Sequence, residues 1–233
     1  QRALSEPRPD IAVLGCRVAK CPRRDLGAGW RRYQVWLNGL VTAEDHAREL
    51  FVESPLAHPS VMFRADAVAA VGGYREVAWA EDYDLWLRLA EAGCALAKHP
   101  RTLLAWRHGP ERLSVRSARY TPRAFLAARA HFLARHPAFH RKEALPRGLV
   151  RTGKQLAALL AGEGIAISHA FTVDRARVGS RFRGAPVHSW LDLPPPGTAP
   201  LIVAVGAPGA RHLIRPEVVR KGYREGNDAF FVG

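Results

Sequence analysis

The sequence predicts an α/β protein of two units, the first over residues 1–140 and the second over residues 145–233. Short apolar runs rich in β-branched residues alternate along the chain with longer stretches in which apolar residues recur at helical spacing. Glycines stand at the ends of several of these stretches, where a helix stops and the chain turns. A length of 233 residues and a hydrophobic content of 48% are sufficient for packed cores.

Local signals predict the elements of the first unit in turn. Strands are expected over residues 11–18, 61–63 and 95–104, and helices over residues 31–40, 43–51, 65–71, 81–92 and 122–135. Thr42 is a suitable N-cap for the second of these helices, and Gly72 and Gly93 are placed to end the third and fourth. Residues 122–135 have an amphipathic pattern, so we expect that helix to pack across the sheet.

The most informative stretch covers residues 81–88 and reads Glu81-Asp82-Tyr83-Asp84-Leu85-Trp86-Leu87-Arg88. Apolar residues recur at helical spacing from Leu85 onward, which places the carboxylates in the first turn of a helix. Unpaired backbone N–H groups and the helix dipole favour negative charge at that position. Two interpretations follow: these carboxylates cap the helix, or they form a catalytic acid–base group.

Several separated motifs favour the catalytic interpretation. They occur in chain order as residues 54–64 (Ser-Pro-Leu-Ala-His-Pro-Ser-Val-Met-Phe-Arg), Gly72-Gly73-Tyr74-Arg75, residues 81–88, Trp106-Arg107-His108 and Arg112-Leu113-Ser114. Their order and spacing resemble the second half of the catalytic domain of family 2, GT-A type glycosyltransferases. The resemblance covers roughly residues 1–135 and implies a partial GT-A (nucleotide-diphospho-sugar transferase) fold for the first unit.

The resemblance also implies an activity and roles for individual residues. The activity is transfer of a sugar from a nucleotide-sugar donor to a hydroxyl of a glycan or lipid-linked acceptor, with inversion. Asp82 corresponds to the base that takes the proton from the acceptor hydroxyl, and Glu81 orients the donor or the base. A divalent metal, Mg²⁺ or Mn²⁺, is expected for the complete enzyme, with His108 as a contact to the metal or diphosphate. Substrate binding is expected at Trp106, Arg107 and Arg112, whose guanidinium groups suit phosphate.

The donor-binding half of that family, which ends in an Asp-x-Asp metal motif, has no counterpart in this sequence. Asp82-Tyr83-Asp84 spells Asp-x-Asp, but it begins a helix, so we interpret it as the base motif. We therefore expect an incomplete nucleotide pocket, no turnover by the chain alone, and Val13 and Val61 at an exposed sheet edge. The alternative function is a non-catalytic remnant that acts as a binding or regulatory module.

The second unit resembles the small Rossmann-like accessory domain attached to some family 2 glycosyltransferases. Residues 148–153 (Gly-Leu-Val-Arg-Thr-Gly) occupy the place of a Gly-x-Gly-x-x-Gly turn, with Val150 where a glycine would let a pyrophosphate approach. A helix is expected over residues 154–161, followed by a strand over 165–173 that ends at Asp174. Further elements are expected at residues 184–187, 201–205, 211–222 and 229–232. We expect no cofactor-binding residues here, and NAD(P) binding that is weak or absent.

Composition limits the classes of partner. The net charge of +14 suggests nucleic acid, but arginine far outnumbers the five lysines, and Ala, Gly and Pro are abundant, as in GC-rich coding. No nucleic-acid motif occurs, so we do not expect that partner. Basic residues are densest from 101 to 151, which suits a peripheral membrane surface or a lipid-linked phosphate. Three irregularly spaced cysteines and the absence of a long apolar run predict a cytoplasmic protein. A peripheral location at the inner face of the membrane is part of the same prediction.

Overall fold

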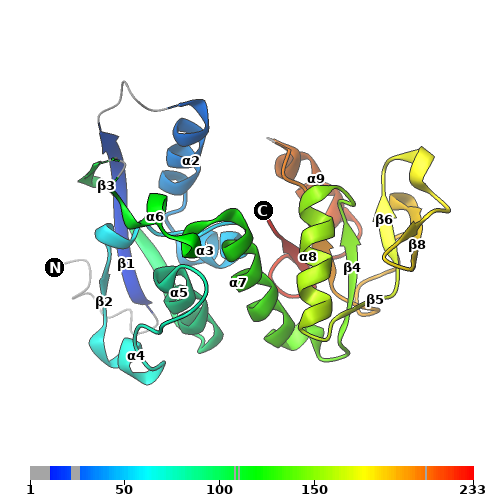
Figure 1. Ribbon diagram of the computed structural model, residues 1–233, viewed down its shortest axis with the longest axis horizontal. Coiled ribbons are helices and arrows are strands. Elements are labelled where there is room, and N and C mark those ends of the chain that lie inside the picture. The colour runs from blue at the N-terminus through cyan, green and yellow to red at the C-terminus, as the bar shows by residue number, and fades with distance from the viewer. Residues whose placement is uncertain (1–10, 22–26, 108, 110, 208) are drawn as a thin grey trace. The chain divides into compact units, whose positions relative to one another are not determined.

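The computed structural model describes residues 11–21, 27–107, 109, 111–207 and 209–233. The protein has two compact units: unit 1 comprises residues 1–50 and 54–125, and unit 2 comprises residues 51–53 and 126–233. Both contain helices and strands, which confirms the predicted α/β class (Figure 1). The change of unit falls inside helix α7 (Pro122–Arg135), before the expected boundary between residues 140 and 145.

The sheet of unit 1 is centred on strand β1 (Ile11–Cys21). Strand β2 (Met62–Phe63) pairs with it in antiparallel orientation, and strand β3 (Ala95–Arg107) pairs with it in parallel orientation. The expectation that Val13 faces an exposed edge is wrong, because β1 has a neighbour on each side and Val13 is fully buried. Strands buried on both faces are typical of parallel pairs, and the apolar run of β1 fits that environment.

The helices that the sequence predicts in unit 1 are present, and α6 is an additional helix that was not predicted. They are α2 (Ala28–Gly39), α3 (Ala43–Glu49), α4 (Ala65–Ala70), α5 (Glu81–Glu91), α6 (Leu113–Arg116) and the start of α7, with short 3₁₀ helices η2 (His58–Ser60) and η3 (Ala118–Tyr120). Thr42 caps α3 as expected: its side chain accepts the Asp45 N–H, and the Asp45 carboxylate accepts the Thr42 N–H. Gly93 follows α5 with a φ of 79°, the left-handed conformation that favours glycine after a helix.

A buried ion pair fixes α5 to the turn that precedes it. Arg88 Nε donates to Asp84 Oδ2 at 2.7 Å, one helical turn apart, and both side chains are almost fully buried. The two Nη atoms of Arg88 donate to the carbonyl oxygens of Val71 and Gly73, at 2.5 and 2.6 Å. Trp79 Nε1 donates to the other oxygen of Asp84 at 3.1 Å. Each nitrogen of the Arg88 guanidinium and each oxygen of the Asp84 carboxylate therefore has a hydrogen-bond partner, which favours a buried charge pair.

Unit 2 contains a mostly parallel sheet. Its strands lie in the order β10-β9-β4-β6-β8-β7, with β5 beside β4; their bounds are β4 (Glu143–Arg147), β5 (Ala166–Ile167), β6 (Ala170–Thr172), β7 (Arg181–Phe182), β8 (Ala185–Ser189), β9 (Leu201–Val203) and β10 (Ala229–Phe231). Only β7 pairs in antiparallel orientation among these described strands. The single strand expected over residues 165–173 is interrupted, because residues 168 and 169 pair with neither neighbour. The strand order reverses between β4 and β9, as in doubly wound folds.

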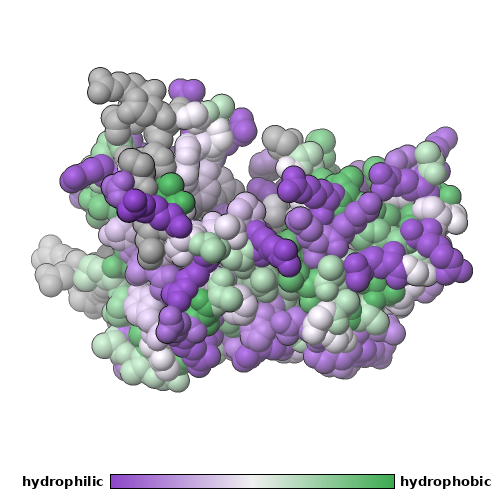
Figure 2. Space-filling model, viewed as in Figure 1, coloured by the Kyte–Doolittle hydropathy of each residue, from purple (hydrophilic) through white to green (hydrophobic). Residues whose placement is uncertain are grey.

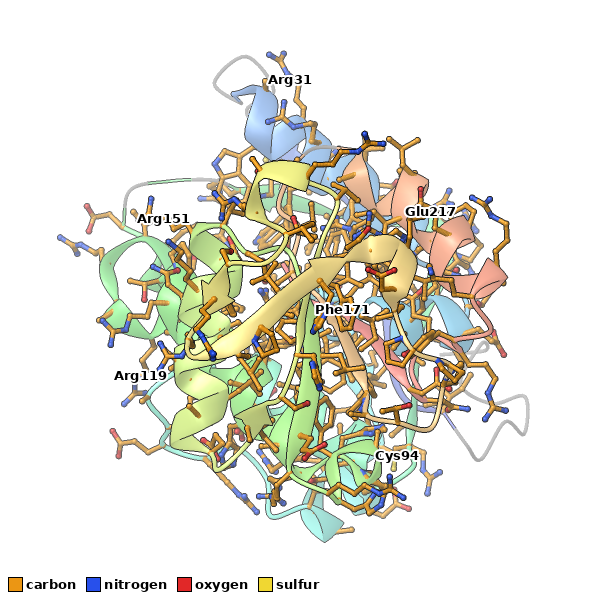
Figure 3. All side chains as sticks on the ribbon, turned by 90° about the vertical axis from the view of Figure 1, so that its right-hand side faces the viewer. Arg31, Cys94, Arg119, Arg151, Phe171 and Glu217 are labelled. Carbon is orange, nitrogen blue, oxygen red and sulfur yellow. The ribbon has the colours of Figure 1, made fainter. Side chains whose placement is uncertain are left out.

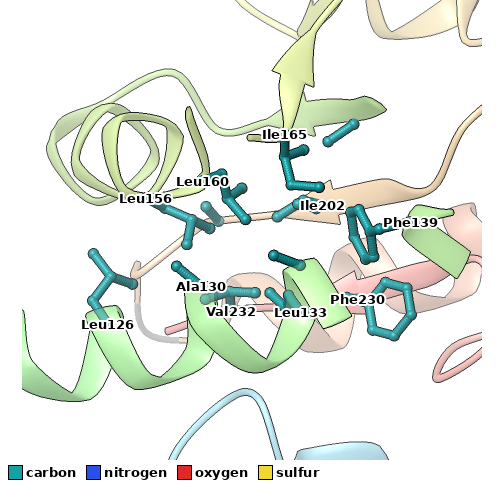
Figure 4. Close-up of a cluster of buried hydrophobic side chains, with 13 residues drawn as sticks. Leu126, Ala130, Leu133, Phe139, Leu156, Leu160, Ile165, Ile202, Phe230 and Val232 are labelled. Atoms are coloured by element: carbon teal, nitrogen blue, oxygen red, sulfur yellow. The ribbon is translucent and has the colours of Figure 1, made fainter. Parts of the chain in front are cut away.

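Two helices share one apolar core with this sheet (Figure 4). Leu126 and Leu133 of α7 and Leu156 and Leu160 of α8 (Arg151–Gly162) lie in one buried cluster with Ile202 and other strand residues. Most of α7 therefore packs in unit 2, and its expected place across the first sheet is wrong from Leu126 onward. Its amphipathic pattern predicts an apolar face, but the pattern alone does not determine which sheet that face covers.

Helix α9 (Ala210–Arg220) contacts strand β4 through a charged residue. Arg147 at the end of β4 forms an ion pair with Glu217 of α9 at 3.3 Å, and its guanidinium lies 3.9 Å from the centroid of the Trp190 ring. The remaining 3₁₀ helices are η4 (Pro137–Phe139), η5 (Arg175–Arg177) and η6 (Trp190–Asp192). Within the described ranges, no helix is both long enough and apolar enough to cross a membrane.

Glycines allow α8 to approach the strand ends closely. Gly148 follows β4 with a φ of 99°, and a Cβ there would lie 2.3 Å from the carbonyl oxygen of Ala204. A Cβ on Gly153 would lie 1.7 Å from the carbonyl oxygen of Gly148. These are the roles of the first and last glycines in a Gly-x-Gly-x-x-Gly turn. Val150, at the middle position, is the N-cap residue of α8 and is exposed.

This packing predicts that Gly153→Ala destabilises unit 2. The added methyl group collides with backbone and not with a flexible side chain, so overpacking should cost at least about 1–3 kcal/mol. Gly162→Ala is the matched control, because it lies in the last turn of the same helix and its added methyl group would have no neighbouring atom within 4 Å. Differential scanning fluorimetry of both variants tests the difference, and equal melting temperatures would show that the close approach is wrong.

The ion pair predicts a larger effect in unit 1. Asp84→Asn leaves the Arg88 guanidinium buried without an anion, so the free energy of unfolding should fall by about 3–5 kcal/mol. Adding Arg88→Met should restore part of that loss. The control is Asp66→Asn, which removes an exposed ion pair with Arg64 and should leave the urea midpoint almost unchanged. Urea unfolding followed by tryptophan fluorescence reports on unit 1, where five of the six tryptophans lie.

Candidate functional site

The acidic cluster at the start of α5 lies in a buried part of unit 1. Helix α5 begins at Glu81 after Ala80, whose side chain offers no cap, and Asp82 is only 9% exposed. Asp82 Oδ1 accepts the backbone N–H of Tyr83 at 2.8 Å. This one hydrogen bond agrees with the interpretation that Asp82 caps the helix. A simple cap is usually solvated, however, and the burial of Asp82 calls for a further explanation.

Side chains from three other segments surround these carboxylates. Tyr120 of η3 donates its hydroxyl hydrogen to Glu81 Oε1 at 2.8 Å. His58 of η2 forms a hydrogen bond with the Tyr74 hydroxyl through Nε2 at 2.8 Å, and its ring meets Trp86 edge-on at 6.3 Å between centroids. The N-terminus of α5 is thus enclosed by polar and aromatic groups far apart in sequence.

Electrostatics distinguish Asp82 from an ordinary surface carboxylate. Burial raises the pKa of Asp82, and the Glu81 carboxylate adds to the rise, while His58 and the Tyr83 N–H oppose it. Burial also raises the pKa of Tyr120, and its hydrogen bond to Glu81 raises it further. Tyr120 is therefore a donor over the physiological pH range. A carboxylate with a raised pKa is a stronger proton acceptor than one in water.

Two buried polar atoms beside Asp82 face no protein partner. Among the described residues, Glu81 Oε2 and Trp86 Nε1 have no hydrogen-bond partner, although both atoms are fully shielded from solvent. Leaving such an atom unpaired costs free energy, so unpaired buried groups often mark a functional site. Glu81 Oε2 is an acceptor on the residue adjacent to Asp82, and Trp86 Nε1 is a donor one helical turn further along α5, so a sugar hydroxyl can pair with either kind of atom.

The residues expected to bind substrate lie at the end of β3 and beyond it. Trp106 and Arg107 are its last two residues, and Arg112 directly precedes α6. The structure brings Arg112 and Trp106 together, with the guanidinium 4.5 Å from the indole centroid, whereas Arg107 is exposed. Burial lowers the pKa of Arg112, and the phenols of Tyr33 and Tyr120 oppose that shift.

The expected metal contact, His108, lies outside the described residues. Within the described part of the chain, no three His, Cys, Asp or Glu side chains are placed to hold a metal ion. Oxygen-rich sites for Mg²⁺ or Mn²⁺ need several such ligands together. The described carboxylates do not fit such a site by themselves, so the metal contact of His108 stays a prediction.

Sequence reasoning missed His58, Tyr74, Tyr120 and Lys20 as members of this region. His58 and Tyr74 lie within the quoted motifs, but nothing in their local spacing indicates a contact across 16 residues. Tyr120 follows the last motif and reaches Glu81 across 39 residues. For Lys20 a signal was present, since a lysine within an apolar strand is unusual in a chain with five lysines among 35 basic residues.

Comparison with known proteins gives one partial likeness. The chain is 35% identical over 65 residues to the amylovoran biosynthesis glycosyltransferase AmsE of Erwinia amylovora, a match that covers 28% of this chain and 24% of that protein. The chain thus spans about a quarter of the length of that relative. No family model matches the chain, and no solved structure matches it. The likeness supports a relationship to glycosyltransferases.

Proposed function

We propose that this protein takes part in inverting transfer of a sugar from a nucleotide-sugar donor to an acceptor hydroxyl, as a family 2, GT-A type glycosyltransferase. The observation that carries the proposal is the buried Asp82 carboxylate at the N-terminus of α5, with a raised pKa and unpaired polar atoms beside it. The likeness to a glycosyltransferase points to the same class of reaction.

In the proposed reaction, Asp82 acts as the general base. Its carboxylate accepts the proton of the acceptor hydroxyl while that oxygen attacks the anomeric carbon, and the nucleoside diphosphate leaves from the opposite face of the sugar. One carboxylate is sufficient for this chemistry, because the configuration is inverted in a single displacement. The raised pKa of Asp82 strengthens it as a base near neutral pH.

The neighbours of Asp82 supply positioning. Tyr120 fixes Oε1 of Glu81, which leaves Oε2 to accept a hydrogen bond from a sugar hydroxyl. Trp86 Nε1 can donate to the same sugar. Trp106 and Arg112 form a flat cationic surface suited to a sugar ring or a phosphate. Holding both substrates together in this way accounts for a large part of the rate gain in transfer reactions.

The finer parts of the proposal extend the resemblance. The acceptor is a glycan or a lipid-linked glycan, and the protein acts in the cytoplasm, at or near the inner face of a membrane. A divalent ion held in part by His108 belongs to the same proposal. In Figure 2, hydrophilic side chains are spread over the visible surface of each unit.

The proposal predicts that Asp82→Asn lowers turnover by at least about a hundredfold, the usual contribution of a general base. The amide is nearly the same size and can still accept the Tyr83 N–H, so folding is preserved. The assay measures release of nucleoside diphosphate from a panel of nucleotide sugars. It uses the natural full-length protein. Asp66→Asn makes the same change at an exposed carboxylate of the same unit and should leave turnover unchanged.

Unchanged turnover in Asp82→Asn would reject Asp82 as the base. Absence of turnover in the unmodified protein with every donor, at any metal concentration, would favour the alternative of a non-catalytic binding module. The two outcomes differ in whether the parent protein is active, so a single experiment separates them.

Burial of Asp82 also predicts a pH-dependent gain in stability for the same variant. Because the folded protein raises the pKa of Asp82, the folded state binds more protons than the unfolded state just above the ordinary pKa, and stability falls as pH rises through that range. Asp82→Asn removes the titration. Its urea midpoint should exceed that of the parent protein at pH 7, and the difference should diminish towards pH 3.5. A lower midpoint at pH 7 would contradict this account.

A further inference from the structure

The buried side chain of Lys20 has no role in the reaction proposed above. Lys20, near the end of β1, pairs in register with Trp106 on β3 and is only 1% exposed. Its ammonium group lies among aromatic rings, 3.1 Å from the centroid of Trp30, 4.4 Å from that of Trp106 and 5.2 Å from that of Tyr33. Lys20 Nζ has no hydrogen-bond partner among the described residues.

The other buried lysine of this unit shows how a structural ammonium group is satisfied. Lys98 on β3 donates from Nζ to the carbonyl oxygens of Leu37 and Pro55. Lys20 has no such acceptor within the described ranges, and the charged group acting on it is a second cation, Arg112. Arg112 also stacks on Trp106, so two cations share one indole ring. Aromatic faces attract cations, but they supply no hydrogen-bond acceptor for the ammonium hydrogens.

We propose that Lys20 and Arg112 are the two cationic contacts of a subsite for a diphosphate group. Both side chains can donate hydrogen bonds, neither is matched by a carboxylate within the described residues, and a diphosphate supplies several acidic oxygens that can accept from such cations. The ligand thus provides the acceptor atoms for each cation. The proposal rests on the proposed glycosyl transfer for the origin of the diphosphate, which belongs either to the nucleotide-sugar donor or to a lipid-linked acceptor.

Trp30 is the ring that a ligand displaces to reach Lys20. It stands in the first turn of α2, is 39% exposed, and lies closer to Nζ than the other two rings. The N-cap of α2, Gly27, makes no side-chain hydrogen bond, and first turns open more readily than helix interiors. A rotation of the Trp30 side chain breaks its cation–π contact with Lys20 and its edge-on contact with the Tyr33 ring at 5.7 Å, and the charge-assisted hydrogen bonds of the ligand offset these losses.

Diphosphate binding at this subsite has a proton signature. Burial, together with repulsion from Arg112, lowers the pKa of Lys20 to about 7 in the free protein. A bound anion favours the charged ammonium form and raises that pKa. At a pH of about 8, Lys20 therefore takes up a proton from solvent as the ligand binds. The groups that act on it are Arg112, which precedes α6, and the aromatic rings of α2 and β3. Pyrophosphate also exchanges protons near this pH, so the uptake assigned to Lys20 is the part that is lost in Lys20→Met.

Isothermal titration calorimetry with inorganic pyrophosphate tests the subsite without any turnover. At a pH of about 8, in buffers of different ionisation enthalpy, the parent protein should bind pyrophosphate with uptake of a fraction of a proton. Lys20→Met keeps a side chain of similar length among the three aromatic rings. This variant should bind pyrophosphate at least tenfold more weakly, without the proton uptake that Lys20 provides. The control Arg31→Met removes one exposed positive charge from the same helix region, where Arg31 projects from α2 (Figure 3), and should change affinity less than twofold.

Two further measurements guard against a variant that fails to fold. Lys20→Arg keeps the charge but does not titrate in this range, so it should bind pyrophosphate without proton uptake. In the parent protein, NMR of ¹³Cε-labelled lysine resolves only five side chains, and the resonance of Lys20 should show its pKa rising on addition of pyrophosphate. No binding, equal loss in Arg31→Met, or unchanged uptake in Lys20→Met would each overturn the subsite.

The source of the diphosphate is identified by comparing a nucleoside diphosphate with a short prenyl diphosphate in the same assay. Tighter binding of the former assigns the subsite to the donor, and tighter binding of the latter assigns it to a lipid-linked acceptor. Asp82→Asn should bind pyrophosphate as the parent protein does. If pyrophosphate binds but every transferase assay fails, the proposed function is wrong and the subsite is supported. If transfer depends on Asp82 but pyrophosphate does not bind, the subsite is wrong and the proposed function is supported.

Discussion

The arrangement of unit 1 depends on the buried ion pair between Asp84 and Arg88. Arg88 reaches from the middle of α5 to the carbonyl oxygens of Val71 and Gly73, so the helix cannot slide or rotate without breaking several buried hydrogen bonds. Such bonds are costly to leave unmade in a low-dielectric interior. The pair therefore fixes where α5 begins, and the start of α5 fixes the positions of Glu81 and Asp82 relative to His58 and Tyr120.

Two acidic residues of one helical turn thus have opposite environments. Asp84 accepts hydrogen bonds from Arg88 and Trp79, and its charge is neutralised within the protein. Asp82 lies two residues earlier, is similarly buried, and has no comparable cation among the described residues, so its pKa rises. A buried carboxylate with a raised pKa, such as Asp82, is a common feature of functional sites. The local sequence Asp-Tyr-Asp does not reveal this difference, because it arises from partners at positions 71, 73, 79 and 88.

What the sequence predicts well is local. Thr42 and Gly93 mark helix ends through contacts within a few residues, and α7 has the bounds that its pattern indicates. What it does not predict depends on distant contacts. The bond between Tyr120 and Glu81, the cage around Lys20, and the packing of α7 in unit 2 each join segments that no short-range periodicity relates. The interruption between β5 and β6 is of the same kind, because pairing with β4 and β8 decides which residues remain in the ladder.

The charges left unbalanced in unit 1 have a common interpretation. Lys20 and Arg112 are cations held against aromatic rings without a carboxylate in the described residues, while Asp82 is an anion held without a cation of its own there. Tyr120 belongs to the acidic group, because its hydroxyl donates a hydrogen bond to Glu81. A protein under selection for stability alone would pair or remove these charges, since each costs free energy when buried. In the glycosyl transfer proposed above, the diphosphate would supply acidic oxygens to Lys20 and Arg112, and the acceptor hydroxyl would supply a proton to Asp82, so the two substrates together account for all three groups.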